Sequence, residues 1–191
     1  MIVVFAVALA LGIQAWFVKP YKIPSGSMEP TLQIGQRILV DRIGMHFTSP
    51  HIGEIMVFHP PVNDEICSDH AQGETAQGAV MPQACDHVGN KESSVTFVKR
   101  VVGLPGDHLQ IINGHVIRNG KQESAPYAVA CQGVQICDFR KTIVVPKGDY
   151  YMMGDNRPDS EDSRFWGPVP RSWLIGQVFL TYWPIGRIGF L

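Results

Sequence analysis

The sequence predicts a mostly β protein, in which one N-terminal transmembrane helix precedes an antiparallel β-sheet domain with a smaller β lobe or insertion. Three observations support this fold class. Short runs rich in Val, Ile, Phe and Tyr recur along the chain, with turn residues between them. The dipeptide Asn113-Gly114 separates two such runs, and both residues tolerate the positive φ of a tight hairpin. The first eighteen residues carry no charged side chain.

Residues 1–18 are expected to form a single membrane anchor, and residues 19–191 the domain that follows it. As a helix, the first segment would span about 27 Å at about 1.5 Å per residue, close to the thickness of a bilayer's hydrocarbon core. A cleaved secretory signal is the alternative, because residues 8–10 form an A-x-A pattern. Cutting there would leave a short apolar core without a preceding basic residue, so a retained anchor is favoured. Lys19 and Lys22 follow the segment and by themselves would place the C-terminal side in the cytoplasm.

The domain after the anchor is expected to consist of short strands. They include Arg37–Asp41, Glu54–Phe58, Thr96–Val102, Leu109–Ile112, His115–Arg118, Thr142–Val145, Tyr150–Met153 and Gln177–Trp183. The polar, glycine-containing segment 63–94 is expected to be a surface insertion. The irregular segment 126–137 is expected to be a second one. No long stretch beyond the anchor has a helical period, and the chain contains no internal repeat.

Charge and cysteine content restrict the compartment and the partners. Lys plus Arg (16) nearly balances Asp plus Glu (17), and the basic residues form no run, so nucleic-acid binding is not expected. The four cysteines are Cys67, Cys85, Cys131 and Cys137. They favour disulfide staples in an oxidising compartment, with three pairings open. Zinc is the alternative, because His70 and His87 lie near two of the cysteines. Outside the cytoplasm neither a metal nor another cofactor is expected.

The first chemically unusual stretch is Ile-Pro-Ser-Gly-Ser-Met-Glu-Pro-Thr-Leu, residues 23–32. Two serines flank a glycine between two prolines, a rigid turn that can present a hydroxyl and backbone N–H groups together. A serine nucleophile needs a base, and an oxyanion needs preorganised donors. Ser-Gly-Ser near prolines is more often a simple loop, so this stretch alone makes Ser25 and Ser27 only candidates.

The second stretch, residues 96–107, carries a lysine inside an apolar strand. Neighbouring residues of a strand point to opposite faces, so one of Lys99 and Arg100 can enter the interior while the other meets solvent. An amine surrounded by apolar groups loses hydration, which lowers its pKa and lets it act as a neutral base near pH 7. The alternative is a lysine that protects a sheet edge from aggregation, which is the commoner role.

The third stretch, residues 153–167, has acidic residues at spacings that invite a calcium-loop interpretation. That interpretation fails, because Arg157 occupies the third position counted from Asp155 and Ser160 replaces the required glycine at the sixth. A solvated turn and a loop that orients a catalytic lysine remain as alternatives.

Together these stretches closely resemble the bacterial type I signal peptidases, a family of Ser–Lys proteases that remove signal peptides from exported proteins. The resemblance covers nearly the whole chain. It rests on the apolar N-terminal segment, the Ser-Gly-Ser-Met box, Gly-Glu-Ile-Met-Val-Phe at residues 53–58, the Lys-Arg-Val-Val-Gly-Leu-Pro-Gly-Asp box, and Gly-Asp-Asn-Arg followed by Ser-x-Asp-Ser-Arg. These boxes occur in the family's order, which makes the resemblance specific.

The resemblance implies a role for each candidate residue. Ser27 would be the nucleophile, and Lys99 the base that takes its proton and later protonates the leaving amine. The hydroxyl of Ser25 and the backbone N–H of Ser27 would stabilise the oxyanion, and Ser160 would hydrogen-bond the lysine amine. A supporting ion pair would join Asp162 and Arg164 near the site.

The resemblance also implies a substrate and a location. Shallow pockets would be shaped by Ile23, Pro24, Met28, Phe97 and Val98. They would favour Ala-x-Ala before the scissile bond of a preprotein signal peptide. The protein would be a single-pass cell-membrane protein with its catalytic domain on the extracytoplasmic side. Membrane lipid is a further expected partner, contacted by an apolar rim that includes Trp166 or Trp183.

Other functions remain as alternatives. A self-cleaving repressor of the LexA type shares the Ser–Lys pair but carries a DNA-binding helical domain, for which this chain shows no pattern. A specialised peptidase that matures a pilin or a conjugation protein would have similar boxes. A membrane-tethered binding domain without activity is disfavoured, because both the serine and the lysine are present.

Overall fold

A computed structural model of the protein describes residue 5 and residues 18–62, 73–74, 80–81, 84–131 and 137–191. Most of the predicted anchor, residues 1–18, therefore lies outside the described residues. Among the residues that are described, no helix is long and apolar enough to cross a bilayer.

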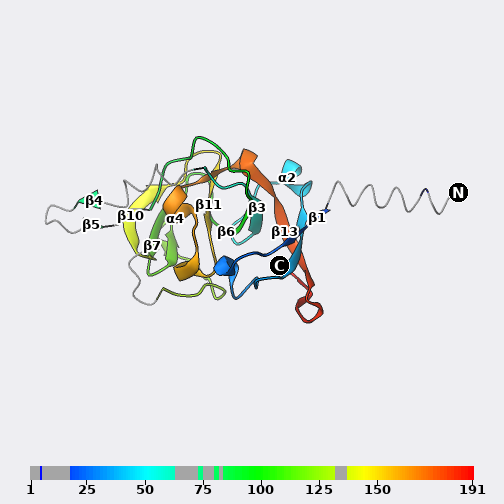
Figure 1. Ribbon diagram of the computed structural model, residues 1–191. Helices are drawn as coiled ribbons and strands as arrows, with labels where there is room; N and C mark the ends of the chain where they lie inside the picture. Colours follow the sequence, from blue (N-terminus) through cyan, green and yellow to red (C-terminus); the bar gives the residue numbers. More distant parts are fainter. Residues whose placement is uncertain (1–4, 6–17, 63–72, 75–79, 82–83, 132–136) are drawn as a thin grey trace.

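The larger sheet is antiparallel, with strands from both ends of the chain beside one another (Figure 1). Its strands, in spatial order, are β1 (Val18–Lys22), β2 (Arg37–Asp41), β13 (Leu174–Trp183), β3 (Ile55–Phe58), β6 (Phe97–Gly103), β11 (Asp149–Met153) and β12 (Val169–Pro170). A further strand, β14 (Gly189–Phe190), pairs with β13. Because β1 is at the edge, Pro20 can lie in it without breaking a ladder on both sides.

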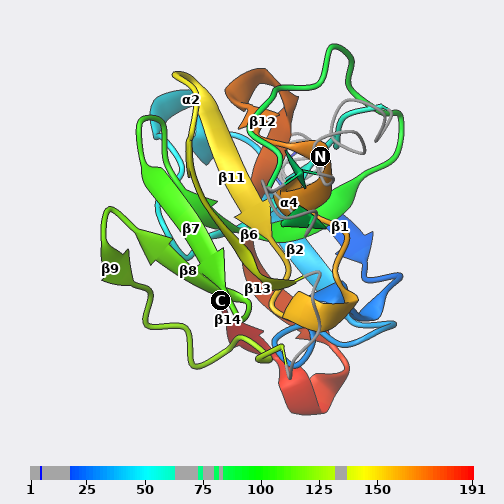
Figure 2. The ribbon, with the colours of Figure 1, turned by 90° about the vertical axis from the view of Figure 1, so that its left-hand side faces the viewer.

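A smaller sheet forms the predicted second β lobe (Figure 2). Its strands, in spatial order, are β10 (Phe139–Val144), β7 (His108–Ile112), β8 (His115–Arg118) and β9 (Lys121–Gln122). The predicted hairpin joins β7 to β8, with φ of 51° at Asn113 and 79° at Gly114. Two short strands, β4 (Gly73–Glu74) and β5 (Val80–Met81), pair within the predicted insertion 63–94, most of which lies outside the described residues.

Helical structure in the described part of the domain is limited to single turns. The α-helical turns are α2 (Gly44–Phe47) and α4 (Ser163–Trp166), and the 3-10 turns are η1 (Gly26–Met28), η4 (Arg157–Asp159), η5 (Arg171–Trp173) and η6 (Ile185–Arg187). All eight expected strands are confirmed. The ends of β2 and β8 match the expected ones, the other six strands have shifted ends, and the largest shifts are at the starts of β10 and β13. The short strands β1, β9, β12 and β14 were not among those expected.

The centre of the larger sheet is buried on both faces. All five residues of β11 are buried, and so are the last five of β6. One apolar cluster around Met28, Leu32 and Ile38 packs beneath the segment after β1. A second cluster includes Trp166, which is 3% exposed and stacks near Phe58. Trp166 therefore lies in the core, and its expected part in an apolar lipid-contacting rim is wrong.

One row of paired residues crosses the larger sheet from its centre to its edge. Lys99 on β6 pairs with Met56 on β3, and Met56 pairs with Gln177 on β13. Gln177 pairs in turn with Asp41 on β2, and Asp41 with Val18 on β1. At about 4.8 Å between neighbouring strands, these four steps span about 19 Å along the sheet. Strand pairing therefore fixes the position of Lys99, at the centre of the sheet, relative to Val18, at the start of β1.

The cysteines are used as disulfides where the structure describes them. Cys131 is bonded to Cys137, and Cys85 is disulfide-bonded as well, while Cys67 lies outside the described residues. A disulfide sulfur is not a thiolate ligand, which argues against a zinc site that uses Cys85. In the described ranges, no three His, Cys, Asp or Glu side chains gather as metal ligands.

Candidate active site

The candidate nucleophile lies on a single 3-10 turn directly after β1. Ser25 is extended and precedes η1, which contains Ser27. Glu29 N donates to Gly26 O at 3.0 Å and closes the turn. Met28 is 1% exposed and anchors the turn in the apolar cluster below it. Burial of its neighbour therefore holds the half-buried Ser27 side chain at the surface.

The loop between β11 and η4 holds this turn from the other side. Asn156 N donates to Ser27 O at 3.0 Å, and Asn156 Nδ2 donates to Gly26 O at 3.2 Å. Gly154 is a point of close approach, because an added Cβ would collide with Ser27 O and with the side chain of Ser160. The nucleophile's backbone is therefore fixed by contacts that a larger residue at position 154 would not permit.

A buried ion pair supports the same loop. Arg100 Nε donates to Asp155 Oδ1 at 2.8 Å, and Arg100 Nη2 to Asp155 Oδ2 at 2.6 Å. Thr31 Oγ1 donates to Asp155 Oδ2 at 2.5 Å and so joins the nucleophile segment to this pair. The ring of Tyr127 covers the Arg100 guanidinium, with 3.9 Å between the ring centroid and Cζ. Arg100 is 8% exposed, so the expectation that one of Lys99 and Arg100 meets solvent is wrong.

Lys99 lies at the centre of the larger sheet, between β3 and β11, and is 3% exposed. The interpretation as a lysine that protects a sheet edge is therefore wrong. Its Nζ lies 5.6 Å from the centroid of the Phe97 ring, and η1 packs against β6 beside it. Burial lowers the pKa of Lys99 from 10.5 to about 8, with Asp162 acting in the opposite direction. A substantial neutral fraction of the amine therefore exists near pH 8.

Ser160, Asp162 and Arg164 form a buried network beside the lysine. Ser160 Oγ donates to Asp162 Oδ2 at 2.7 Å, and Gly154 N donates to the same oxygen at 3.0 Å. Arg164 Nε donates to Asp162 Oδ1 at 2.8 Å, and Nη2 to Oδ2 at 2.9 Å. Burial would raise the pKa of Asp162, but the Arg164 guanidinium outweighs it and keeps this pKa below the ordinary value. Asp162 is therefore held as a carboxylate.

The expected contact between Ser160 and Lys99 has a different form in the structure. The Ser160 hydroxyl is directed to Asp162, and within the described chain Lys99 Nζ has no hydrogen-bond partner. Ser25 Oγ lies 3.5 Å from Ser27 Oγ, so the two hydroxyls share one small surface region. Catalytic hydrogen bonds are often long in a ligand-free site and tighten when substrate binds.

The five residues expected to shape the substrate pockets divide into two groups. Ile23 and Met28 are 2% and 1% exposed, so they support the site from below. Pro24 is exposed, and Phe97 and Val98 are half-buried, so these three offer apolar surface to a ligand. The surface that these three residues offer to a bound chain is therefore apolar.

Sequence reasoning missed several residues that build the site. Asn156, which tethers the Ser27 turn, and Asp155, which pairs with Arg100, were seen only as parts of an acidic turn. Gly154 has no special φ, and its close approach to the Ser27 turn is a tertiary feature. Their position shortly before Ser160 was the signal that could have identified them.

The chain is similar to known proteins over most of its length. The family model described as "Signal peptidase, peptidase S26" matches residues 1–183. A probable signal peptidase I-2 of Synechocystis is 36% identical over 188 residues, covering 98% of this chain and 73% of that protein. Signal peptidase I of Leptolyngbya laminosa is 36% identical over 186 residues, covering 97% of this chain and 79% of that protein. A crystal structure of a signal peptidase I from Enterococcus faecalis aligns with a TM-score of 0.44 at 22% identity, covering 68% of this chain and 97% of that one.

Proposed function

This chain belongs to the signal peptidase family S26, whose members are serine peptidases, and from that membership we propose a Ser–Lys dyad protease that removes signal peptides after Ala-x-Ala. The observation that carries the proposal is the position of a serine turn against a central strand with a buried lysine. The lowered pKa of Lys99 makes the amine usable as a base without a histidine.

In the proposed reaction, neutral Lys99 accepts the proton of Ser27 Oγ as this oxygen attacks the scissile carbonyl carbon. The Ser27 N–H and the Ser25 hydroxyl donate hydrogen bonds to the carbonyl oxygen as it becomes negative. The Lys99 ammonium then gives its proton to the departing amine, which leaves an acyl group on Ser27. Water attacks this ester, with Lys99 again taking a proton, and the serine is regenerated.

Three neighbours position the lysine in this proposal. Asp162 accepts the Ser160 hydroxyl hydrogen bond and is itself held by Arg164, so the serine side chain is fixed beside the amine. The negative charge of Asp162 also favours the ammonium form of Lys99 that arises during the reaction. Ser160, Asp162 and Arg164 therefore act as positioning residues, while Ser25, Ser27 and Lys99 touch the reacting atoms.

The proposed specificity follows from the shape of the apolar wall. Pro24, Phe97 and Val98 offer shallow apolar surface, which suits small side chains such as alanine better than large or charged ones. The proposed substrates are therefore preproteins with Ala-x-Ala at the end of the signal peptide.

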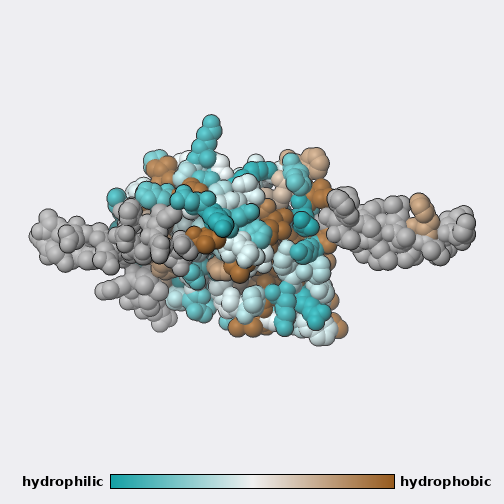
Figure 3. Space-filling view, turned by 45° about the horizontal axis from the view of Figure 1, so that its top comes forward, coloured by the Kyte–Doolittle hydropathy of each residue, from teal (hydrophilic) through white to brown (hydrophobic). Residues whose placement is uncertain are grey.

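The proposed location is the extracytoplasmic side of the cell membrane, with residues 1–18 as a single anchor. Support comes from apolar surface on the described domain, which Figure 3 shows in brown reaching the edge that carries β1. Trp183 is 50% exposed, and beyond it Ile185 and Phe190 are 72% and 85% exposed. Such residues at the end of β13 are suited to contact with lipid.

The test compares wild type, Ser27→Ala and Lys99→Ala on a preprotein whose signal peptide ends in Ala-x-Ala. Ser124→Ala and Lys121→Ala are matched controls, because both residues are exposed and distant from the site. We expect cleavage after the second alanine by wild type and both controls, and folded but inactive Ser27 and Lys99 variants. Normal cleavage by Lys99→Ala would contradict the dyad, and inert, folded wild type would contradict the enzyme assignment.

A further inference from the structure

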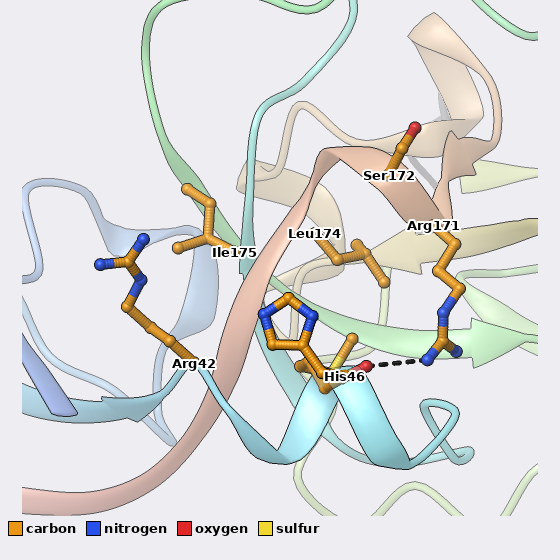
Figure 4. Close-up of a pocket in the computed structure, with 7 residues that line it drawn as sticks. Arg42, His46, Arg171, Ser172, Leu174 and Ile175 are labelled. Carbon is orange, nitrogen blue, oxygen red and sulfur yellow. Dashed lines mark hydrogen bonds between the residues drawn. The ribbon is translucent and has the colours of Figure 1, made fainter. Parts of the chain in front are cut away.

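A pocket lies between α2 and the first residues of β13 (Figure 4), and neither Ser27 nor Lys99 lines it. Its cavity volume is about 450 Å³. It is lined by three cationic or titratable side chains, Arg42, His46 and Arg171, and by Met45, Ser172, Leu174 and Ile175. The pocket thus combines an apolar floor with basic groups at its rim.

The three basic side chains differ in what they already bind. Arg171 is occupied, since its guanidinium donates to Met45 O at 2.8 Å and Thr48 O at 2.7 Å and so holds α2 in place. The side chains of Arg42 and His46 are exposed, and neither side chain makes a hydrogen bond or an ion pair with the described residues. They are the groups left to bind an anionic ligand.

The carboxylate closest in sequence, that of Asp41, does not line the pocket and makes no ion pair with Arg42. Asp41 Oδ1 accepts hydrogen bonds from Ile43 N at 2.9 Å and Gly44 N at 3.0 Å, and so holds the backbone between β2 and α2. The lining residues include two guanidinium groups and no carboxylate, which suits an anion.

The pocket's place in the sheet indicates where that anion would come from. Asp41 pairs with Val18, so Arg42 lies one residue beyond the register partner of the last residue of the predicted anchor. Figure 1 shows α2 beside the end of β1 at which the chain enters the sheet. Phe47, on the same turn as His46, is 84% exposed. A basic pocket beside an exposed aromatic ring at this position fits a bilayer interface.

We propose that this pocket binds the phosphate-bearing headgroup of an acidic phospholipid. Arg42 and His46 would donate hydrogen bonds to the phosphate oxygens, and Leu174 and Ile175 would contact the glycerol end of the acyl chains. The proposal rests on the membrane location proposed above and concerns none of the residues assigned to catalysis. It gives the protein a lipid-specific contact that orients the domain on the membrane.

The test uses the full chain in mixed micelles of a neutral detergent. Binding of fluorescent phosphatidylglycerol is measured against phosphatidylcholine with the same acyl chains and label. Wild type is compared with Arg42→Gln, with Arg42→Gln/His46→Gln, and with Lys121→Gln, which removes an exposed charge from the smaller sheet.

We expect wild type and Lys121→Gln to prefer phosphatidylglycerol. Arg42→Gln should weaken that binding about fivefold, as one cation near an anionic surface contributes about 1 kcal/mol. The double variant should lose the preference. Equal binding by wild type and the double variant would overturn the proposal. Displacement of the lipid by millimolar inorganic phosphate would identify a free-phosphate site instead, and displacement by polyglutamate an acidic protein partner.

Cleavage of a preprotein in detergent without acidic lipid separates this proposal from the proposed function. All four proteins should cleave equally there, because none of the substitutions is near Ser27 or Lys99. Inactivity of all four, with the lipid preference intact, would contradict the peptidase assignment alone. Equal activity without a lipid preference in wild type would contradict the lipid site alone.

Discussion

The proposed general base is an amine buried in the middle of a sheet. Burial lowers the pKa of Lys99 to about 8, and a general base must be unprotonated to act. We therefore expect kcat/KM to rise with pH and to reach half of its maximum at about pH 8. Steady-state cleavage between pH 6 and 10 measures this. A flat profile, or a midpoint near the ordinary lysine value of 10.5, would contradict the role of Lys99.

The same burial should make the lysine costly for stability. A folded-state pKa of about 8 against 10.5 means that the unfolded chain binds more protons between these values. The contribution of Lys99 to stability is thus least favourable below pH 8 and improves as the pH rises to 10.5. We expect Lys99→Met to raise the free energy of unfolding by about 1 to 3 kcal/mol at pH 7 while abolishing activity.

Urea unfolding at pH 7 and pH 10 checks this expectation. The gain from Lys99→Met should shrink at the higher pH, because the wild-type amine is then mostly neutral in the folded and partly neutral in the unfolded chain. A variant that is less stable than wild type at both pH values would show that the amine makes favourable contacts outweighing its desolvation.

At the scale of elements, the contact between the β11–η4 loop and the η1 turn should control the position of the nucleophile. A Cβ at position 154 would meet both Ser27 O and the Ser160 side chain. We expect Gly154→Ala to reduce kcat about 100-fold, since a shift of about 1 Å in a reacting group has an effect of this size. Gly186→Ala is the matched control, because a Cβ there has no neighbour within 4 Å. Equal activity of the two variants would contradict the role of this contact.

The elements themselves were largely predictable, because their signals are local. Alternating apolar residues and turn pairs such as Asn113-Gly114 identified the strands of both sheets. The strand β1 was missed because it follows an apolar segment without a turn and contains Pro20. The burial of Arg100 was missed because it depends on Asp155, which is distant in sequence and adjacent only in the fold.

The site was predictable only in part, for a related reason. Lys99 stood out because a lysine within an apolar strand violates the usual pattern of burial. The resemblance between motifs then supplied Ser25, Ser160 and their partners. No local signal could show that Asn156 holds the turn, because that contact joins segments that are distant in sequence. Ser160 and Asp162 are only two residues apart, but the sequence did not show that the hydroxyl donates to this carboxylate.

At the scale of the whole molecule, membrane contact should involve the end of β13 and spare the core. We expect brominated phosphatidylcholine to quench tryptophan fluorescence of the full chain, and part of that quenching to disappear in Trp183→Phe. Trp166→Phe is the matched control, since Trp166 is 3% exposed and Trp183 is 50% exposed. Identical quenching of wild type and Trp183→Phe would show that this edge does not meet lipid.

The row of paired residues from Val18 to Lys99 sets a fixed distance across the larger sheet. Backbone pairing across five strands sets about 19 Å between the start of the sheet and Lys99, the proposed catalytic base. A signal helix lying beside the anchor would need about six extended residues, at about 3.3 Å each, to carry its scissile bond over that length. We expect preproteins shortened by three residues in this spacer to escape cleavage, as measured by mapping the products of a spacer series.

Efficient cleavage of the shortened preproteins would show that substrates approach along another path. If this distance determines where substrates are cut, the choice of scissile bond depends on the number of spacer residues. It also depends on the small side chains that fit the proposed pockets. The hydrogen bonds between strands contact no substrate. They would nevertheless set the required length of the spacer between the signal helix and the scissile bond. An insertion that shifted the register of β2 or β13 would change the spacer length that the enzyme accepts. It would do so without altering any residue that contacts the peptide.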